Sequence, residues 1–297
     1  MIEFIEDILK AKDVKFKKNT SLAALSTIRI GGNCAAVIYP DSEEKLIFSL
    51  RLLRDKGIKY RVLGRMSNVL PPDEAFSGVI VRTDLLLDFL FDGEDLRCGA
   101  GISLPALSVL ARERRLSGLE ELSGIPGSLG GAVFGNAGAY GREICELLRG
   151  VRAYSIESGE LLTLSRYDID FAYRYSSFKM WNLVLLSVNL KLAFSDIERI
   201  TARTEELRRR RCDSSPREPS LGSTFKRPRE GYASKMIDEC GLRGMKVGDA
   251  AISDKHAGYI VNLGRARSRD VKGLVEIAEN AVYEKFGVRL EREIEYL

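Results

Sequence analysis

Eighteen residues near the middle of the chain constrain its structure more than any other stretch. Residues 124–141 read GIPGSLGGAVFGNAGAYG, and seven of the eighteen are glycine. Because glycine loses much chain entropy on folding, so dense a cluster indicates left-handed backbone or backbone that lies close to another group. Successive main-chain N–H groups without side chains form concave anion sites, and a long run of them suits two linked phosphates. A glycine-rich structural turn between strands is the alternative.

Composition narrows the range of partners. The 297 residues suffice for two domains with separate cores, and 45% of them are hydrophobic, as in ordinary globular proteins. The 46 basic and 42 acidic residues are mostly interspersed, so we expect no nucleic-acid partner. The basic run 208–211 is the exception, and the solvated end of a helix accounts for it.

The counts of histidine and cysteine exclude several kinds of catalytic site. His256 is the only histidine, which rules out a Ser-His-Asp triad and multi-histidine metal sites. The five cysteines have no CxxC spacing, which favours free thiols in a reducing cytoplasm and predicts no metal. The N-terminus lacks the apolar core of a secretory signal, and no apolar stretch is long enough to insert into a membrane. We therefore expect a cytoplasmic protein.

The hydrophobic pattern predicts short strands and helices in irregular alternation. Apolar spacing predicts helices over 2–12, 42–56, 104–116, 196–211, 232–240 and 268–286, and strands over 151–156, 160–164 and 183–192. The last helix has Ser268 as its expected N-cap and Gly287 as its stop, and a terminal strand follows over 288–297. No strand leads into GxGxxG and no GxxxxGK[ST] is present, so neither a Rossmann unit nor a P-loop is supported.

Several sequence blocks occur in the order typical of one enzyme family. They are STIRIGG, GRMSNVL, LSGIPGSLGGAVFGNAGAYG, FAYRYSSFK, GSTFKRP, KHAGYIVN and LEREI. From Thr27 to Ile294 the chain resembles the UDP-N-acetylenolpyruvoylglucosamine reductases, and its length is similar to that of the shorter type. The resemblance implies an α+β fold: a two-lobed FAD-binding domain of the vanillyl-alcohol-oxidase type over 1–195, then a smaller α/β substrate-binding domain over 196–297. The terminal strand is expected to pack back toward the active site.

The resemblance also implies the cofactor and the residues that hold it. Two loops, residues 64–68 and 124–141, would bind FAD around its pyrophosphate and neighbouring groups. The expected contacts are Gly64, Arg65, Met66, Ser67, Asn68, Gly124, Ile125, Pro126, Gly127, Ser128, Gly130, Gly131, Asn136, Ala137 and Gly138. Met66 stands where the family pattern has glycine, so we expect left-handed backbone there at a cost of about 1 kcal/mol.

Three residues match the family's catalytic positions. The resemblance implies that NADPH reduces FAD and that hydride then passes to C3 of the enolpyruvyl ether of UDP-N-acetylglucosamine, forming UDP-N-acetylmuramate for peptidoglycan synthesis. Arg174 would stabilise negative charge on the pyruvyl carboxylate, Ser223 would protonate C2, and Glu293 would hold or share a proton. The spacing to Ile294 favours Glu293 over Glu291. The residues expected to bind substrate are Tyr173, Lys226 and Arg210.

The chain departs from the family pattern between Arg211 and Pro219. The residues there read CDSSPRE where the family often has a lysine and a glutamine-proline pair, and Arg210 or Arg217 is expected to supply the lost contact. One alternative function is an FAD-dependent alcohol or sugar oxidase or dehydrogenase on the same fold. Another is a non-catalytic relative that binds flavin or a UDP-sugar, which the joint presence of Arg174, Ser223 and Glu293 disfavours. We expect a monomer.

Overall fold

The computed structural model describes residues 2–297 and divides into two compact units. The first unit comprises the residues up to Lys18 together with 36–65 and 78–211, and the second comprises 19–35, 66–77 and 212–297. The compact units therefore part at Arg211, after most of the charged helix, whereas the sequence placed the domain boundary near residue 195. Two N-terminal segments also belong to the second unit.

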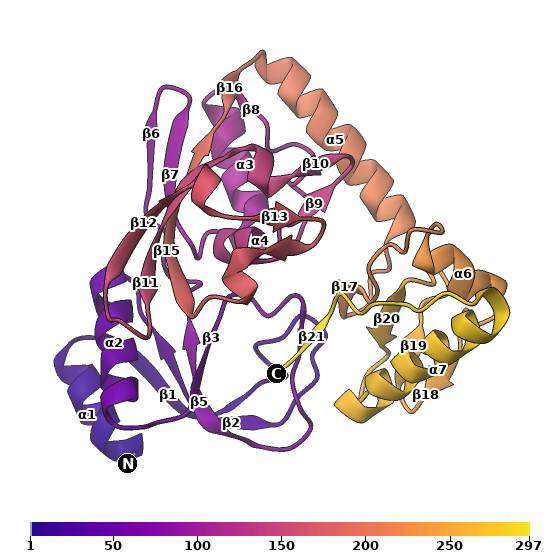
Figure 1. Ribbon diagram of the computed structural model, residues 1–297, viewed down its shortest axis with the longest axis horizontal. Coiled ribbons are helices and arrows are strands. Elements are labelled where there is room, and N and C mark those ends of the chain that lie inside the picture. Colours follow the sequence, from indigo (N-terminus) through magenta and orange to yellow (C-terminus); the bar gives the residue numbers. More distant parts are fainter. Residues whose placement is uncertain (1) are drawn as a thin grey trace. The chain divides into compact units, whose positions relative to one another are not determined.

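The first lobe of the first unit is a four-stranded sheet covered by two helices (Figure 1). The strand order is β1-β2-β5-β3, with β1 (Lys15–Ser21), β2 (Asn33–Tyr39), β3 (Tyr60–Leu63) and β5 (Phe76–Arg82). The helices are α1 (Ile2–Ala11) and α2 (Glu43–Asp55), and their apolar faces pack on the sheet through Ile5, Leu9, Leu46, Leu50 and Leu53. The hydroxyl of Ser42 accepts the Lys45 N–H and fixes the start of α2.

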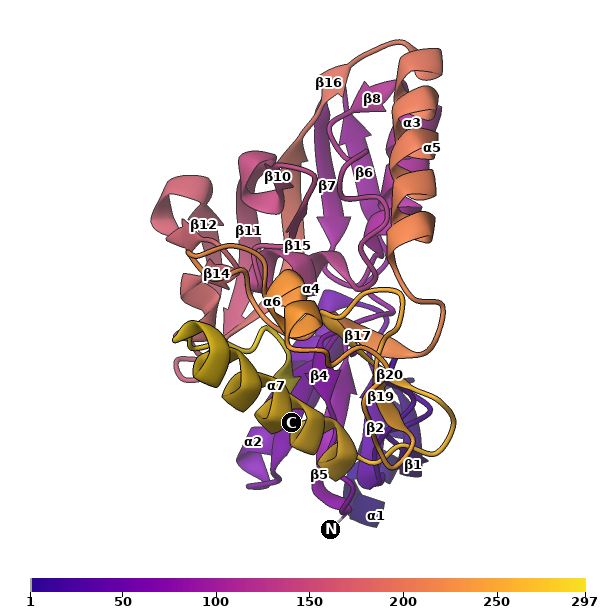
Figure 2. The same cartoon turned by 90° about the vertical axis from the view of Figure 1, so that its right-hand side faces the viewer.

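The second lobe is a five-stranded antiparallel sheet (Figure 2). Its order is β12-β11-β15-β7-β6, with β6 (Phe89–Asp92), β7 (Asp95–Gly99), β11 (Leu148–Ser155), β12 (Leu161–Ser165) and β15 (Leu183–Lys191). The core of this lobe also includes residues of α3 (Leu104–Glu113) and α4 (Leu129–Phe134). Short elements complete it: β8 (Leu116–Ser117), β9 (Gly138–Ala139), β10 (Arg142–Glu143), β13 (Phe171–Ala172), β14 (Tyr175–Ser176), β16 (Ala193–Phe194), and the 3-10 turns Ile144–Glu146, Arg166–Asp168 and Ser177–Lys179.

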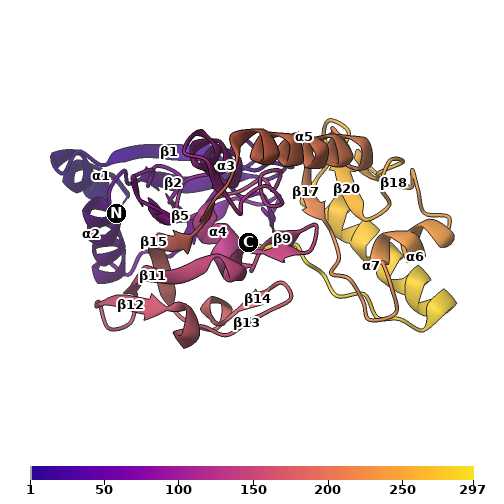
Figure 3. The ribbon, with the colours of Figure 1, turned by 90° about the horizontal axis from the view of Figure 1, so that it is seen from above.

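The second unit packs two helices on a small antiparallel sheet (Figure 3). The sheet order is β17-β20-β19-β18, with β17 (Ser220–Ser223), β18 (Lys246–Val247), β19 (Ala250–Ile252) and β20 (Tyr259–Asn262). The helices are α6 (Ala233–Glu239) and α7 (Ser268–Phe286), and α5 (Ile197–Ser214) leads into this unit along the chain. At the end of the chain, β21 (Glu295–Tyr296) pairs in parallel with β4 (Val69–Leu70).

The structure confirms the predicted helices and the three strands, and corrects two details. Arg267, not Ser268, is the N-cap of α7, because the carboxylate of Asp73 accepts the Ser268 and Arg269 N–H groups at 2.7 and 3.0 Å. Of the terminal strand predicted over 288–297, only β21 is formed. The residues before it make isolated main-chain hydrogen bonds to the 224–226 segment and no continuous ladder. Gly287 ends α7 in the left-handed conformation, as expected.

None of the described helices is long and apolar enough to cross a membrane. Within residues 2–297, no group of three or more His, Cys, Asp or Glu side chains is arranged to hold a metal ion.

Candidate functional site

The glycine-rich loop is fixed to the first turn after β7. The N–H groups of Leu129 and Gly130 donate to the carbonyls of Ile102 and Ala100, both at 2.8 Å. The hydroxyl of Ser128, which is 3% exposed, caps α4 by accepting the Gly131 N–H at 3.3 Å. Because main-chain hydrogen bonds to residues 100 and 102 fix the loop, its backbone is held in one conformation before any ligand binds.

Some of the glycines are needed for packing inside the protein. A Cβ at Gly64 would lie 2.3 Å from the Ser128 hydroxyl oxygen, so the two candidate anion loops contact each other here. A Cβ at Gly130 would lie 2.9 Å from the Cβ of Ala100, and one at Gly138 would lie 2.8 Å from the carbonyl oxygen of Arg142. The structural alternative therefore accounts for these three positions.

Other groups in the loop suit an anionic ligand. Neither Gly124 nor Gly127 donates its amide N–H within the described chain, and Gly127 is left-handed with φ +133°. Gly131 and Gly135 have no close neighbour that a Cβ would strike. Two unpartnered N–H groups three residues apart, on a loop of small residues, fit the phosphates of a dinucleotide such as FAD.

Replacing Gly130 by alanine is expected to destabilise the protein and weaken its affinity for FAD. The added methyl group overlaps Ala100, and overpacking of this kind costs about 1–3 kcal/mol. Gly135→Ala is the matched control, since its Cβ would have only an ordinary contact of 3.5 Å with the Gly131 carbonyl. Denaturant unfolding and flavin fluorescence titration measure both effects. Equal behaviour of the two variants would contradict the packing role of Gly130.

Met66 adopts the strained backbone expected from its place in the glycine pattern. Its φ is +51°, and its side chain is 3% exposed. Burial of the side chain more than offsets a strain of about 1 kcal/mol, because an apolar side chain removed from water contributes about 1.5–3 kcal/mol. A non-glycine residue can therefore occupy this position.

Asn68 links the first candidate loop to the end of the chain. Its side-chain amide donates to the Glu293 carbonyl at 2.9 Å, and its own carbonyl accepts the Glu295 N–H at 2.9 Å. These bonds continue into the β4–β21 pairing. Asn68 thus fixes the position of the segment that carries Glu293.

The structure brings Ser223 and Glu293 together through the main chain of one residue. Ser223 ends β17 opposite Tyr259 of β20. Its neighbour Thr224 donates its N–H to the Gly258 carbonyl at 2.8 Å and accepts the Glu293 N–H on its carbonyl at 2.9 Å. Ser223 and Glu293 are both half-buried. Two candidate catalytic residues separated by seventy positions are therefore backbone neighbours.

The contacts of Lys226 separate the two candidate carboxylates. Lys226 forms an ion pair with Glu291, and its N–H also donates to the Glu291 carbonyl at 2.8 Å. The Glu291 side chain is 72% exposed, whereas Glu293 is half-buried. A carboxylate already neutralised by lysine is poorly suited to proton sharing, which argues against Glu291.

Arg174 lies in a two-residue turn between β13 and β14. Its φ is +56°, a conformation that non-glycine residues adopt only under local constraint. Its guanidinium donates to the Gly138 carbonyl at 3.0 Å and lies 4.9 Å from the centre of the Tyr173 ring. The turn that carries Arg174 is therefore bonded to the glycine-rich loop, and Tyr173 is exposed beside it.

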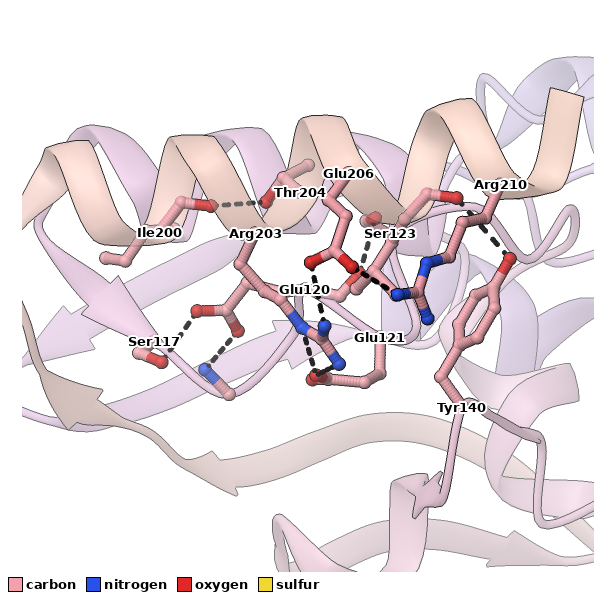
Figure 4. Close-up of polar contacts among 12 residues, drawn as sticks. Ser117, Glu120, Glu121, Ser123, Tyr140, Ile200, Arg203, Thr204, Glu206 and Arg210 are labelled. Carbon is pink, nitrogen blue, oxygen red and sulfur yellow. Dashed lines mark hydrogen bonds and ion pairs between the residues drawn. The ribbon is translucent and has the colours of Figure 1, made fainter.

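Helix α5 places its arginines differently from one another (Figure 4). Arg210 is 62% exposed and pairs with Glu206 at 2.6 Å, and Glu206 also binds Arg203, which reaches Glu121 at 3.0 Å. The aliphatic part of Arg211 lies over Gly124, where a Cβ would be 2.7 Å from its Cδ. Arg211 therefore lies against the glycine-rich loop, whereas the sequence named Arg210, since the residues in one basic run cannot be told apart without the helix's contacts.

His256 belongs to the segment that supports Ser223. Its Nδ1 accepts the Gly258 N–H at 3.2 Å, and the Gly258 carbonyl in turn accepts the Thr224 N–H. Burial lowers the pKa of the ring, which keeps the imidazole neutral so that it can accept this bond. These contacts give His256 a structural role.

Comparison with known proteins identifies both parts of the chain. Residues 34–165 match the family described as FAD binding domain, and residues 215–297 match the C-terminal domain of UDP-N-acetylenolpyruvoylglucosamine reductase. The enzyme of that name from Caldicellulosiruptor bescii is 40% identical over 98% of this chain and 94% of its own length. The one from Pseudothermotoga lettingae is 41% identical over 95% and 97%. These matches confirm the predicted FAD cofactor.

A solved structure supports the same assignment for the fold. The crystal structure of UDP-N-acetylenolpyruvylglucosamine reductase from Thermus caldophilus superimposes with a TM-score of 0.81 at 34% identity. The match covers 95% of this chain and 98% of that one. The predicted α+β fold, an FAD-binding domain followed by a smaller domain, is therefore confirmed.

Proposed function

Because the chain belongs to the UDP-N-acetylenolpyruvoylglucosamine reductase family, an oxidoreductase family, we propose that it reduces UDP-N-acetylglucosamine enolpyruvate to UDP-N-acetylmuramate with NADPH. The observation that carries this proposal is the shared contact of the Ser223 and Glu293 segments with Thr224. Through this contact the main chain of Glu293 is hydrogen-bonded to the residue that follows Ser223, and both residues belong to sequence blocks typical of the family. In the cell, such a reaction would serve peptidoglycan precursor synthesis.

The glycine-rich loop and the 64–68 loop would hold FAD. FAD bound there would supply the chemistry that carries hydride between NADPH and the enolpyruvyl double bond. The amides of Gly124 and Gly127 would donate to its phosphates, and the contact of Gly64 with Ser128 keeps the two loops together. The protein's contribution here is to bind and orient.

The side chains of the site would handle charge and protons on the substrate. Hydride addition at C3 of the enolpyruvyl group leaves negative charge on C2 and the adjoining carboxylate. Arg174 would stabilise that charge, because its guanidinium is permanently protonated. Ser223 would transfer its hydroxyl proton to C2, and Glu293 would hold or share a proton there. Lys226 and Tyr173 would bind other parts of the substrate.

The two neighbouring glutamates provide a kinetic test of these roles. We expect Glu293→Gln to lower kcat by about 100-fold, as for removal of a group that handles a proton. Glu291→Gln should leave kcat nearly unchanged. It should raise KM a few-fold, because Lys226, which would bind substrate, loses the ion pair that holds its side chain in position. Steady-state rates over a range of substrate concentrations measure both. The opposite pattern would assign the proton chemistry to Glu291.

A product assay tests the proposed function itself. The purified protein, supplied with FAD, NADPH and UDP-N-acetylglucosamine enolpyruvate, should consume NADPH in proportion to the enolpyruvyl sugar. Mass spectrometry should detect a product two mass units heavier than that substrate, as expected for UDP-N-acetylmuramate. NADPH consumption that needs oxygen and leaves the sugar unchanged would contradict the proposal.

A further inference from the structure

We infer that Asn136 is a positioning residue for Arg174, holding the arginine's turn against the glycine-rich loop. The inference rests on the proposed function, since it assumes that Arg174 acts on the substrate. It also assigns the Asn136 side chain a role within the protein, whereas the sequence suggested a contact with FAD.

The side-chain amide of Asn136 is fully used inside the protein. The residue is 0% exposed. Its Nδ2 donates to the Glu143 carboxylate at 2.7 Å and to the Ala172 carbonyl at 2.9 Å, and its Oδ1 accepts the Cys145 N–H at 3.4 Å. Both amide hydrogens are therefore committed, and one of them is bonded to the residue two positions before Arg174.

Two further bonds join the same pair of segments. The Arg174 guanidinium donates to the Gly138 carbonyl at 3.0 Å, and the Ser176 hydroxyl donates to the Phe134 carbonyl at 2.7 Å. Ser176 is also 0% exposed. Positions 134, 136 and 138 of the loop thus contact 176, 172 and 174 of the hairpin. We call these three bonds the clasp.

Asparagine is the residue type that the central bond of the clasp requires. The φ angle of Asn136 is +44°, and asparagine tolerates left-handed backbone better than most residues. Only a primary amide offers two donors and an acceptor on so short a side chain. Aspartate would lose both donors and place a second carboxylate beside Glu143.

The clasp explains how Arg174 keeps its strained conformation. A non-glycine residue at φ +56° persists only where the surrounding structure over-determines it. Without the Asn136 bond, the Ala172 carbonyl would lose the donor that ties it to the glycine-rich loop, and the turn could relax. A displacement of about 1 Å in a catalytic group can cost about 100-fold in rate.

The test compares two half-reactions of the FAD-loaded enzyme by anaerobic stopped flow. In Asn136→Ala we expect NADPH to reduce the flavin within about 3-fold of the wild-type rate. Reoxidation by UDP-N-acetylglucosamine enolpyruvate should be slowed about 100-fold, the penalty expected for a misplaced catalytic group. Leu50→Ala is the control for stability loss, because Leu50 is buried in the core of the first lobe. It should slow neither step at temperatures where it is folded.

A second variant decides the matter if Asn136→Ala does not fold. The pair Asn136→Asp and Glu143→Gln restores a hydrogen bond between positions 136 and 143 but removes the bond from position 136 to the Ala172 carbonyl. We expect it to fold and to show the same selective loss in reoxidation. Equal slowing of both half-reactions, or none, in the folded variant would overturn the inference. Failure of the wild-type enzyme to be reoxidised by the sugar would instead overturn the proposed function.

Discussion

Replacing Ser223 by alanine should lower kcat by about 10²–10⁴-fold, the usual contribution of a positioned acid. The variant loses the only hydroxyl proposed to protonate C2, while Thr224 keeps its main-chain bonds to Gly258 and Glu293. The fold and FAD binding should therefore persist. Steady-state turnover and anaerobic reduction by NADPH measure the effect, and only the first should fall.

Ser220→Ala is the matched control for this prediction. Ser220 lies on the same strand, β17, and contributes its carbonyl as acceptor for the Thr27 hydroxyl, a bond that the substitution keeps. Its turnover should stay within about 2-fold of the wild type, as for most substitutions away from a site. Full turnover in Ser223→Ala would contradict the role of Ser223 as proton donor.

Replacing Arg174 by methionine should lower kcat by about 10²–10³-fold, the usual effect of removing one group that stabilises transition-state charge. Methionine keeps the length of the side chain but loses both the charge and the bond to the Gly138 carbonyl. Arg174→Lys should recover only part of the rate, because lysine cannot make a bidentate contact with a carboxylate. Rates at saturating substrate measure both variants.

Arg142→Met is the control for charge alone. Arg142 lies on β10 and pairs with Glu146 at 2.9 Å, close in sequence to the loop but outside the clasp. Its removal should leave kcat nearly unchanged. Similar losses in Arg142→Met and Arg174→Met would show that net charge, not the position of Arg174, governs the rate.

Local sequence patterns predicted the elements that depend on local forces. The apolar spacing of 268–286 and the stop at Gly287 predicted α7, while the left-handed backbone of Met66 was predicted from the family's glycine pattern. The N-cap of α7 was wrong because Asp73, almost two hundred positions earlier, supplies its carboxylate to the first turn. Only the folded chain reveals a cap from so distant a residue.

The composition of the second unit could not be predicted for the same reason. Residues 19–35 and 66–77 join the C-terminal part of the chain through contacts such as the β4–β21 pairing and the bond from Asn262 to the Ile28 carbonyl. Strands of two residues carry no periodicity that a sequence pattern could detect. The predicted boundary near residue 195 was placed at the start of the charged helix.

The candidate site was predictable by residue type but not by contact. The blocks gave Arg174, Ser223 and Glu293, while the structure adds Thr224 as the link between two of them. The density of glycine suggested either an anion site or a structural turn for the loop as a whole. The structure shows close packing at some positions, as at Gly130, and an amide without a partner in the described chain at others, as at Gly127.

An anaerobic visible spectrum tests the central proposal most directly. The purified protein, loaded with FAD, is recorded before NADPH, after NADPH, and after UDP-N-acetylglucosamine enolpyruvate. We expect the flavin absorbance to bleach with NADPH and to return with the enolpyruvyl sugar in the absence of oxygen. Absorbance that returns only when oxygen is admitted would contradict the proposed function and indicate an oxidase. Bound flavin that NADPH does not reduce would also contradict it and indicate a non-catalytic relative.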